Sequence, residues 1–330
     1  MRAHVLAYRG RGSLSFDDLT LARSRAAFKG ETEVGRTADL VVYTDNTPNG
    51  NASAQAVLKT AEADFQAVRQ WFGGISLPAG QPGDDQTTPR TATPCQVLID
   101  SQAGGAYHFG CDATDIYIEP TPELASGFMV AELVEIFEAA INNGWQCGQT
   151  NGEALSRVLA TARNSGLAQL QVQTGQAWWA AGHHDYVTNN SATDQDENSN
   201  GCGPLFLYYL HSQLGFDWTR ITTTGGSTLG DTYQRLTGKS GAAGFQDFLN
   251  RLATLDQGGT LQLPASGDPF PIGATGQAPN TGPGAAGADP SAPVAAAPSG
   301  GFGGAISLLV ILIVVVIALI ALNAMGIFQF

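Results

Sequence analysis

"MVAELVEIFEAAINNGWQCGQTNGEALSR", residues 129–157, contains two helical segments separated by a glycine turn. Glu132, Glu135 and Glu138 fall on one i, i+3, i+6 stripe of the first segment, and apolar side chains fill its remaining face. An amphipathic helix with a solvated acidic face shows the same pattern, so the stripe by itself favours surface glutamates. Together with Glu153 in the second segment, the same spacing also fits a metal site or the remnant of one.

Strand signals precede this stretch, and helical signals follow it. ADLVVYTD (38–45) and CQVLIDS (95–101) each predict a strand, and a helix over 53–72 follows the first of them. YHFGCDATDIYIE (107–119) predicts a third strand and leaves a fourth open. The turn signals of residues 47–50 separate that first strand from its helix. Strands first and helices afterwards predict an α+β fold, with a small N-terminal sheet, one covering helix and a mainly helical C-terminal half.

Over roughly residues 38–256 this order of elements resembles the catalytic core of the gluzincins, the thermolysin-like metallopeptidases. In that family a helix carries H-E-x-x-H, whose histidines bind zinc and whose glutamate activates the metal-bound water. A glutamate of the next helix, often within Asn-Glu-Ala or Gly-Glu-Ala, is the third ligand. Here AELVE (131–135) stands in place of H-E-x-x-H, and NGEALSR (151–157) follows. The resemblance implies a zincin-like fold with Glu132 at the general-base position and Glu135 and Glu153 at ligand positions.

The sequence departs from the family at both histidines of the motif. Ala131 has no donor atom, and Glu135 offers oxygen instead of nitrogen. Zinc takes most of its protein ligands from imidazole or thiolate, so this ligand set does not support zinc, and two carboxylates suit Ca²⁺, Mg²⁺ or Mn²⁺ better. The remaining candidate ligands are histidines outside this motif. His183 and His184 are adjacent in sequence and can supply one ligand at most. His108 and His211 are isolated, and isolated histidines are more often structural than ligating.

We therefore expect a catalytically inactive metallopeptidase-like domain without a cofactor. Its partner would be a peptide or protein that lies along the strand above the former cleft. The alternative is a divergent metal-dependent hydrolase that uses Glu132 as general base, with Glu135, Glu153 and one recruited histidine as ligands. A third hypothesis is a structural surface or envelope protein. Nucleic acid is excluded as a partner, because the net charge is −13 and there is no block of basic residues.

A second, weaker metal pattern lies in DQDENSNG, residues 194–201. Asp194, Asp196 and Asn198 place oxygen ligands at every second position, as calcium loops do, although the spacing is not that of an EF-hand. The simpler interpretation is an acidic, solvated loop that caps a helix starting near Pro204. Calcium binding by this loop is therefore kept as the alternative.

The chain has four cysteines, Cys95, Cys111, Cys147 and Cys202, and no C-x-x-C. Three disulfide pairings are open, and Cys95 with Cys111 would join two adjacent predicted strands. Four buried free thiols in a reducing compartment are the alternative.

The C-terminal part of the chain predicts a tether and an anchor. Residues 258–304 are dense in Gly, Pro and Ala and predict a flexible linker after the globular domain of residues 38–257. AISLLVILIVVVIALIAL (305–322) has Ser307 as its only polar side chain and predicts one transmembrane helix, followed by a short tail, 323–330. We expect a single-pass membrane protein with a C-terminal anchor. A cytoplasmic domain is the simplest topology, because the N-terminus contains no continuous apolar signal sequence, but the side of the membrane is left open, since no Lys or Arg flanks the helix. The structure of residues 1–37 is left open.

Overall fold

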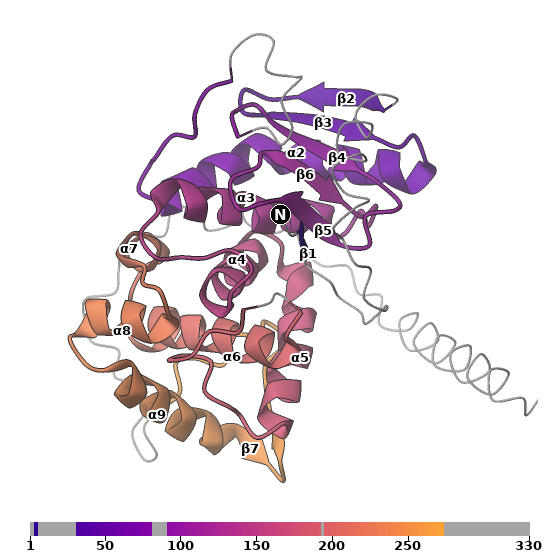
Figure 1. Ribbon diagram of the computed structural model, residues 1–330. Helices are drawn as coiled ribbons and strands as arrows, with labels where there is room; N and C mark the ends of the chain where they lie inside the picture. Colours follow the sequence, from indigo (N-terminus) through magenta and orange to yellow (C-terminus); the bar gives the residue numbers. More distant parts are fainter. Residues whose placement is uncertain (1–2, 6–30, 81–90, 193–194, 274–330) are drawn as a thin grey trace, which may run out of the picture. The chain divides into compact units, whose positions relative to one another are not determined.

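The first half of the chain forms a mixed β-sheet in the computed structural model, which describes residues 3–5, 31–80, 91–192 and 195–273. Among these residues the six strands of the sheet lie in the order β1-β5-β6-β4-β3-β2 (Figure 1). The central strands β3, β4 and β6 are parallel, whereas β2, β5 and β1 each pair antiparallel with their inner neighbour. The strands are β1 (Ala3–Val5), β2 (Thr32–Arg36), β3 (Leu40–Thr44), β4 (Cys95–Ile99), β5 (Ala106–Phe109) and β6 (Asp115–Ile118).

The three strands predicted from the sequence are confirmed, and residues 107–119 form two strands, so that these segments are β3 to β6. Their runs are apolar because the central parallel strands are buried on both faces: Val97 on one face and Leu98 on the other are at most 1% exposed. β1 and β2 lie within residues 1–37, which the sequence pattern left open. Both are short and pair at the edges of the sheet, where no long apolar run is needed.

Two helices, α2 (Pro48–Trp71) and α3 (Ala125–Ile141), cover one face of the sheet. α2 packs on β2 and β3, and α3 packs on β5 and β6. The sequence predicted a turn over residues 47–50, but α2 already begins there. The hydroxyl of Thr47 accepts the Gly50 N–H at 3.0 Å, and Pro48 occupies the first helical position, where its missing N–H costs no helical hydrogen bond.

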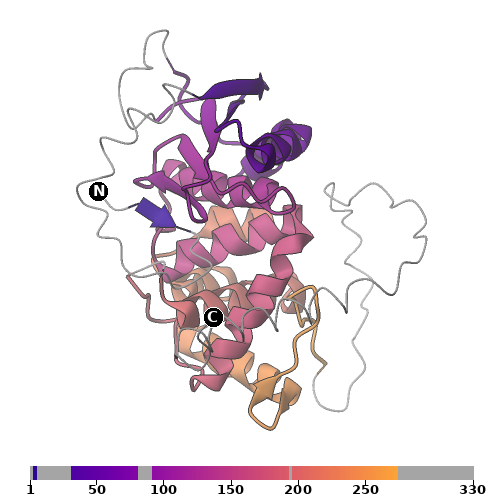
Figure 2. The same cartoon turned by 90° about the vertical axis from the view of Figure 1, so that its right-hand side faces the viewer.

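The remaining helices form a layer next to α3, on the side away from the sheet (Figures 1 and 2). α4 packs on α3, α6 packs on α4, and α5 packs on α6. The predicted α+β order of a strand-rich first half and a helical second half is confirmed. The elements of this layer are α4 (Thr150–Arg163), η2 (Ser165–Leu167), α5 (Ala168–Ala180), α6 (Glu197–Tyr208), the π-helical η3 (Tyr209–Gln213), α7 (Trp218–Thr224), α8 (Leu229–Thr237), α9 (Gly241–Leu252), η4 (Ala253–Leu255) and the hairpin of β7 (Asp256–Gln257) with β8 (Thr260–Leu261).

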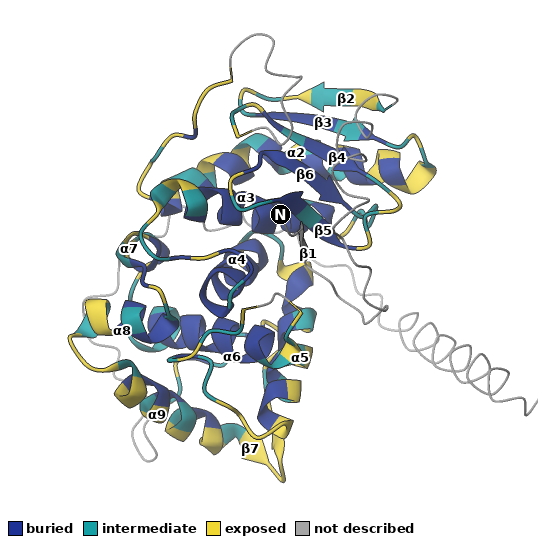
Figure 3. Ribbon diagram, in the orientation of Figure 1, coloured by how far each residue is buried: buried dark blue, intermediate teal, exposed yellow. Residues whose placement is uncertain are grey.

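α3 is the central helix, with the sheet and α2 on one side and α4 on the other. Residues 127–138 of α3 are all buried, so the helix meets solvent on almost none of its circumference (Figure 3). This overturns the expectation of a solvated acidic face. Both stripes are buried, because α3 packs against the sheet, α2 and α4.

The globular domain extends past residue 257, the boundary predicted for it. Leu261 and Phe270 are buried, and the Ile272 N–H donates to the Gln213 side chain at 2.6 Å. The rest of the predicted linker, the predicted transmembrane helix 305–322 and the tail lie outside the described residues. Within the described ranges, no helix combines the length and the apolar character needed to cross a bilayer.

Candidate functional site

Four glutamates meet where α3 packs against α4. Glu132 and Glu135 of α3 and Glu153 of α4 are each 1% exposed, and Glu138 of α3 is fully buried. The three positions that the family resemblance singled out are therefore brought to one place in the interior. Burying several carboxylates together is costly unless cations, hydrogen bonds or protons compensate their charge. The residues around the glutamates show how this is achieved.

His108, from β5, lies between two of the glutamates. Its Nδ1 is 3.4 Å from Oε2 of Glu132, and its Nε2 is 3.7 Å from Oε2 of Glu135. The ring is fully buried. The sequence predicts an isolated structural histidine at position 108, whereas the structure places His108 in the glutamate cluster. The alternation of side chains along the strand carried a signal for this. His108 is on the same face of β5 as Ala106, which is buried, so the His108 ring points into the core.

Glu153 is held by groups of its own helix and of the loop before it. Arg157 lies one turn later on α4, with Nη2 3.5 Å from Oε2 of Glu153, and the Gly148 N–H donates to Oε1 at 3.1 Å. The guanidinium side chain is 3% exposed. Arg157 also lines, with Ala131 and others, a cavity of about 10 Å³, which is room for about one water molecule. The position of the family's first histidine is thus next to a small cavity that an arginine borders.

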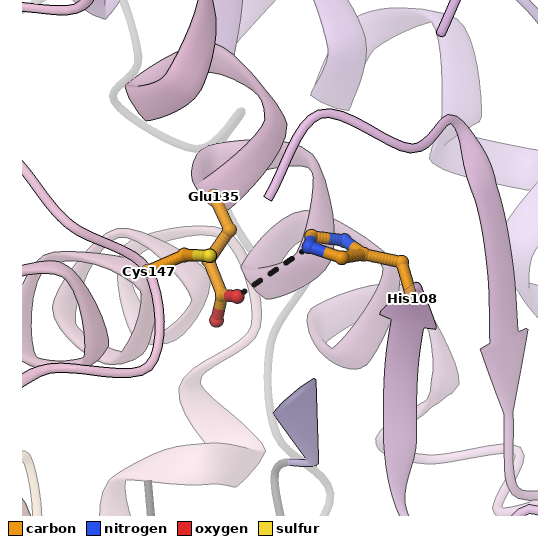
Figure 4. Close-up of side chains that lie close together, drawn as sticks. All are labelled: His108, Glu135 and Cys147. Carbon is orange, nitrogen blue, oxygen red and sulfur yellow. Dashed lines mark ion pairs between the residues drawn. The ribbon is translucent and has the colours of Figure 1, made fainter. Parts of the chain in front are cut away.

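The disulfide of the chain joins Cys111, just after β5, to Cys147, in the loop before α4, with a Cα–Cα distance of 5.7 Å. The pairing of Cys95 with Cys111 is wrong, and Cys95 and Cys202 are buried and form no disulfide. Cys95 begins β4 and Cys111 follows β5, two strands that are consecutive in sequence but separated by β6 in the sheet. The sulfur of Cys147 lies close to the cluster: His108, Glu135 and Cys147 each place one ligand atom within 4.8 Å of the others (Figure 4).

The cluster shifts the titration of its carboxyl groups. Burial raises the pKa of Glu135 well above its usual range, and the neighbouring glutamates, first Glu153, add to the shift, while Arg157 opposes it. Burial and Glu153 likewise raise the pKa of Glu138. Neither carboxylate oxygen of Glu138 accepts a hydrogen bond from a described residue. A Cβ at Gly152 would lie 2.5 Å from Oε2 of Glu138 and 2.4 Å from the Gln146 carbonyl oxygen, so a glycine is required here.

We expect Glu138→Gln to flatten the dependence of stability on pH. A carboxyl whose pKa is raised on folding contributes stability that is fully present below its unfolded pKa and is lost as the pH rises through the folded pKa. The wild-type free energy of unfolding should therefore fall as the pH rises above the usual titration range of a glutamate, and that of Glu138→Gln should fall less. Urea unfolding at a series of pH values measures both slopes.

The matched control is Glu33→Gln at the surface. Arg36 lowers the pKa of Glu33 through a hydrogen bond, so this carboxyl contributes in the opposite direction, and its removal should leave the alkaline slope unchanged. Equal slopes for wild type and Glu138→Gln would show that Glu138 is ionised in the folded protein over the whole range.

The predicted ligand set of Glu135, Glu153 and a histidine is brought together only in part. Within the described ranges, the group with three ligand atoms close enough for one metal ion is His108, Glu135 and Cys147, and Glu153 does not belong to it. The sulfur of Cys147 is bonded to Cys111, so it is not the thiolate that a metal binds. His183 and His211 lie elsewhere and stack on Trp179 and Trp218, with ring centroids 4.7 and 4.1 Å apart.

The predicted calcium loop has a structural role at one of its residues. Oδ1 of Asp196 accepts the backbone N–H groups of Asn198 and Ser199 at 3.0 and 3.3 Å and so caps α6. The helix therefore begins at Glu197 and not near Pro204. Asp194 lies outside the described residues, and calcium binding by this loop stays a prediction.

Comparisons of the chain with protein-family models, with curated proteins and with solved structures found no match. The candidate site consists of His108 of β5, the glutamates of α3 and α4, Arg157 and Cys147.

Proposed function

We propose that this chain is a catalytically inactive domain of zincin-like fold that binds an extended peptide along the edge of β5. The observation that carries the proposal is the pairing of β1 with β5. Residues 3–5 pair antiparallel with residues 107–109, and His4 is opposite His108 of the glutamate cluster. Without β1, β5 is the edge strand of the sheet, with a row of backbone donors and acceptors open to another strand.

Strand addition explains how such an edge recognises a peptide. The main-chain hydrogen bonds of the added strand provide affinity, and contacts of alternate side chains provide specificity. β1 has three residues, so few ladder hydrogen bonds hold it. A peptide of matching length would compete with β1 for the same register. In the folded chain, β1 thus occupies the site at which the peptide would bind.

The surroundings of the glutamates support the absence of hydrolysis. Arg157 faces the carboxylate of Glu153, which the family resemblance assigned as a ligand. Glu132, at the general-base position, is 1% exposed and lies beside Nδ1 of His108. A general base must reach the water that it activates, and a carboxylate ligand must be available to the metal. Here Glu132 is buried beside His108, and Glu153 is paired with Arg157.

The second candidate function, a divergent metal-dependent hydrolase, is favoured by one observation. His108 places Nε2 3.7 Å from Glu135, so a nitrogen ligand stands beside one of the two predicted carboxylate ligands. In this function Glu132 would be the general base. Hydrolysis that requires an added divalent metal and is lost in Glu132→Gln would establish it.

A synthetic peptide with the sequence of residues 1–8, MRAHVLAY, tests the proposed function. In His4→Pro the proline removes one backbone N–H and fixes φ near −65°, so β1 should leave β5. We expect the fluorescently labelled peptide to bind His4→Pro about tenfold more tightly than the wild-type chain, a difference of about 1.4 kcal/mol. His4→Ala is the matched control, because it keeps the backbone N–H and should bind the peptide as the wild type does.

The recovered peptide decides between the two functions. Mass spectrometry should find it intact after incubation with the full chain and zinc. Cleavage would support the hydrolase instead, and equal weak binding by His4→Pro and His4→Ala would remove the case for strand addition at β5.

We further propose that residues 305–322 anchor this domain to a membrane, as their uninterrupted apolar run predicts. The full chain should then fractionate with membranes, and a variant without residues 305–322 should not. Protease accessibility of the linker in intact cells would establish on which side of the membrane the domain lies.

A further inference from the structure

Three side chains with metal-binding atoms converge beside the disulfide. His108 comes from β5, Glu135 from α3 and Cys147 from the loop between α3 and α4, and Figure 4 shows them pointing toward one another. One ligand atom of each lies within 4.8 Å of the other two. The exposed fractions of the three residues are 0%, 1% and 7%. Imidazole nitrogen, carboxylate oxygen and thiolate sulfur are the donors that proteins use for zinc.

Glu132 orients the imidazole for this role. Nδ1 of His108 is 3.4 Å from Oε2 of Glu132. With its proton on Nδ1, facing that carboxylate, the ring directs the lone pair of Nε2 toward Glu135. Histidines that bind zinc are commonly held in this way by a carboxylate at the other ring nitrogen. Glu132 is therefore a positioning residue in this arrangement.

The missing element is the thiolate, because the sulfur of Cys147 is bonded to Cys111. We propose that this disulfide gates a zinc site: when a dithiol reductant opens it, Cys147 joins His108 and Glu135 as a ligand of Zn²⁺. Two anionic ligands would then balance the charge of the metal, which favours a neutral site in a buried position. This inference goes beyond peptide binding and does not depend on it.

The chemistry of the gate is thiol–disulfide exchange. Cys111 is partly exposed and Cys147 is buried, so a thiolate of the reductant reaches the sulfur of Cys111 first. A new S–S bond forms there, the Cys111–Cys147 bond breaks, and its electron pair leaves on the sulfur of Cys147. The second thiol of the reductant then displaces Cys111, which takes up a proton, and the reductant ends as a cyclic disulfide. The protein gains two electrons, and Cys147 binds zinc as the thiolate.

Two serine variants separate the role of the disulfide from that of the ligand. Cys111→Ser and Cys147→Ser both remove the disulfide, but only Cys111→Ser keeps the sulfur of Cys147. After dialysis of the full chain against zinc without reductant, we expect about one zinc ion per chain in Cys111→Ser, and none in Cys147→Ser or in the oxidised wild type. Metal content is measured by mass spectrometry. Cobalt in place of zinc should give a sulfur-to-metal absorption band in Cys111→Ser alone.

A second set of variants tests the other ligands and the other thiols. Adding His108→Gln or Glu135→Gln to Cys111→Ser should abolish zinc uptake, whereas adding Cys95→Ser together with Cys202→Ser should leave it unchanged. Equal zinc in Cys111→Ser and Cys147→Ser would overturn the proposal, because the metal would then bind elsewhere.

The wild-type chain provides the decisive measurement if the serine variants fold poorly. A phosphine reductant opens the disulfide in the presence of zinc, and circular dichroism monitors the fold. Zinc uptake upon reduction that His108→Gln, which keeps the disulfide, does not show supports the gate. A reduced wild-type chain that takes up no zinc, whether it stays folded or unfolds, overturns it.

Discussion

Replacing Arg157 with methionine is expected to lower the free energy of unfolding by about 3–5 kcal/mol at pH 7, because it breaks a buried ion pair from one side. Nη2 of Arg157 lies 3.5 Å from Oε2 of Glu153, and both side chains are at most 3% exposed. Without the guanidinium, the Glu153 carboxylate remains in the interior, close enough to Glu135 and Glu138 to raise their pKa values. The apolar stem of methionine fills part of the space but compensates no charge. Urea unfolding of the two proteins at pH 7 measures the difference.

Two controls identify the cause of this loss. Arg251→Met removes an ion pair of the same i, i+4 spacing, in which the Arg251 and Asp247 side chains are 25% and 45% exposed, and should cost about 1 kcal/mol or less. Arg157→Met combined with Glu153→Gln replaces both charges, and it should recover much of the stability that the single variant loses. If Arg157→Met costs no more than Arg251→Met, the guanidinium does not compensate the buried glutamates.

Opening the Cys111–Cys147 disulfide by Cys111→Ser is expected to cost about 2–4 kcal/mol of stability. The bond joins residues that are 36 positions apart and ties the end of β5 to the start of α4. Its removal lets the unfolded chain explore conformations that the closed loop excludes. It also frees the two segments that carry His108 and Glu153 to separate. The measurement is urea unfolding of Cys111→Ser and of the wild type, each with and without reductant.

Reductant should lower the stability of the wild type to that of Cys111→Ser and leave the variant unchanged. Cys95→Ser, which alters a buried cysteine outside the disulfide, should keep the full response to reductant. A wild-type chain whose unfolding midpoint does not move upon reduction would contradict the expected contribution of the bond. Excess zinc should return part of the lost stability to Cys111→Ser and none to Cys147→Ser, because a ligand that binds only the folded state stabilises it.

Local periodicity was sufficient to locate most elements of this chain. Short apolar runs located β3 to β6, and helical spacing located α2 and α3. It failed where an element is too short or too polar to carry a period: β1 and β2 lie at the edges of the sheet, and α6 begins at Glu197, seven residues before the predicted start at Pro204. The N-terminus of α6 is determined by the side chain of Asp196, which caps the helix. A single capping residue produces no periodic pattern in the sequence.

The candidate site could likewise be predicted only in part from local spacing. Spacing within one helix placed Glu132, Glu135 and Glu138 on one stripe, and the next helix was correctly identified as the carrier of Glu153. The burial of that stripe could not be read from the helix, because burial depends on what packs against it. The pairing of Cys111 with Cys147 depended on strand order, in which β6 separates β5 from β4.

The sequence by itself determined the order of strands and helices and the positions of the glutamates, because these follow from contacts between residues a few positions apart. Only the tertiary structure decided what surrounds the glutamates. It brought His108 from β5 to within 3.7 Å of Glu135 on α3, and the sulfur of Cys147 to the same place. Such contacts join segments that are distant along the chain and form when sheet and helices pack together to bury their apolar faces. No local pattern encodes them.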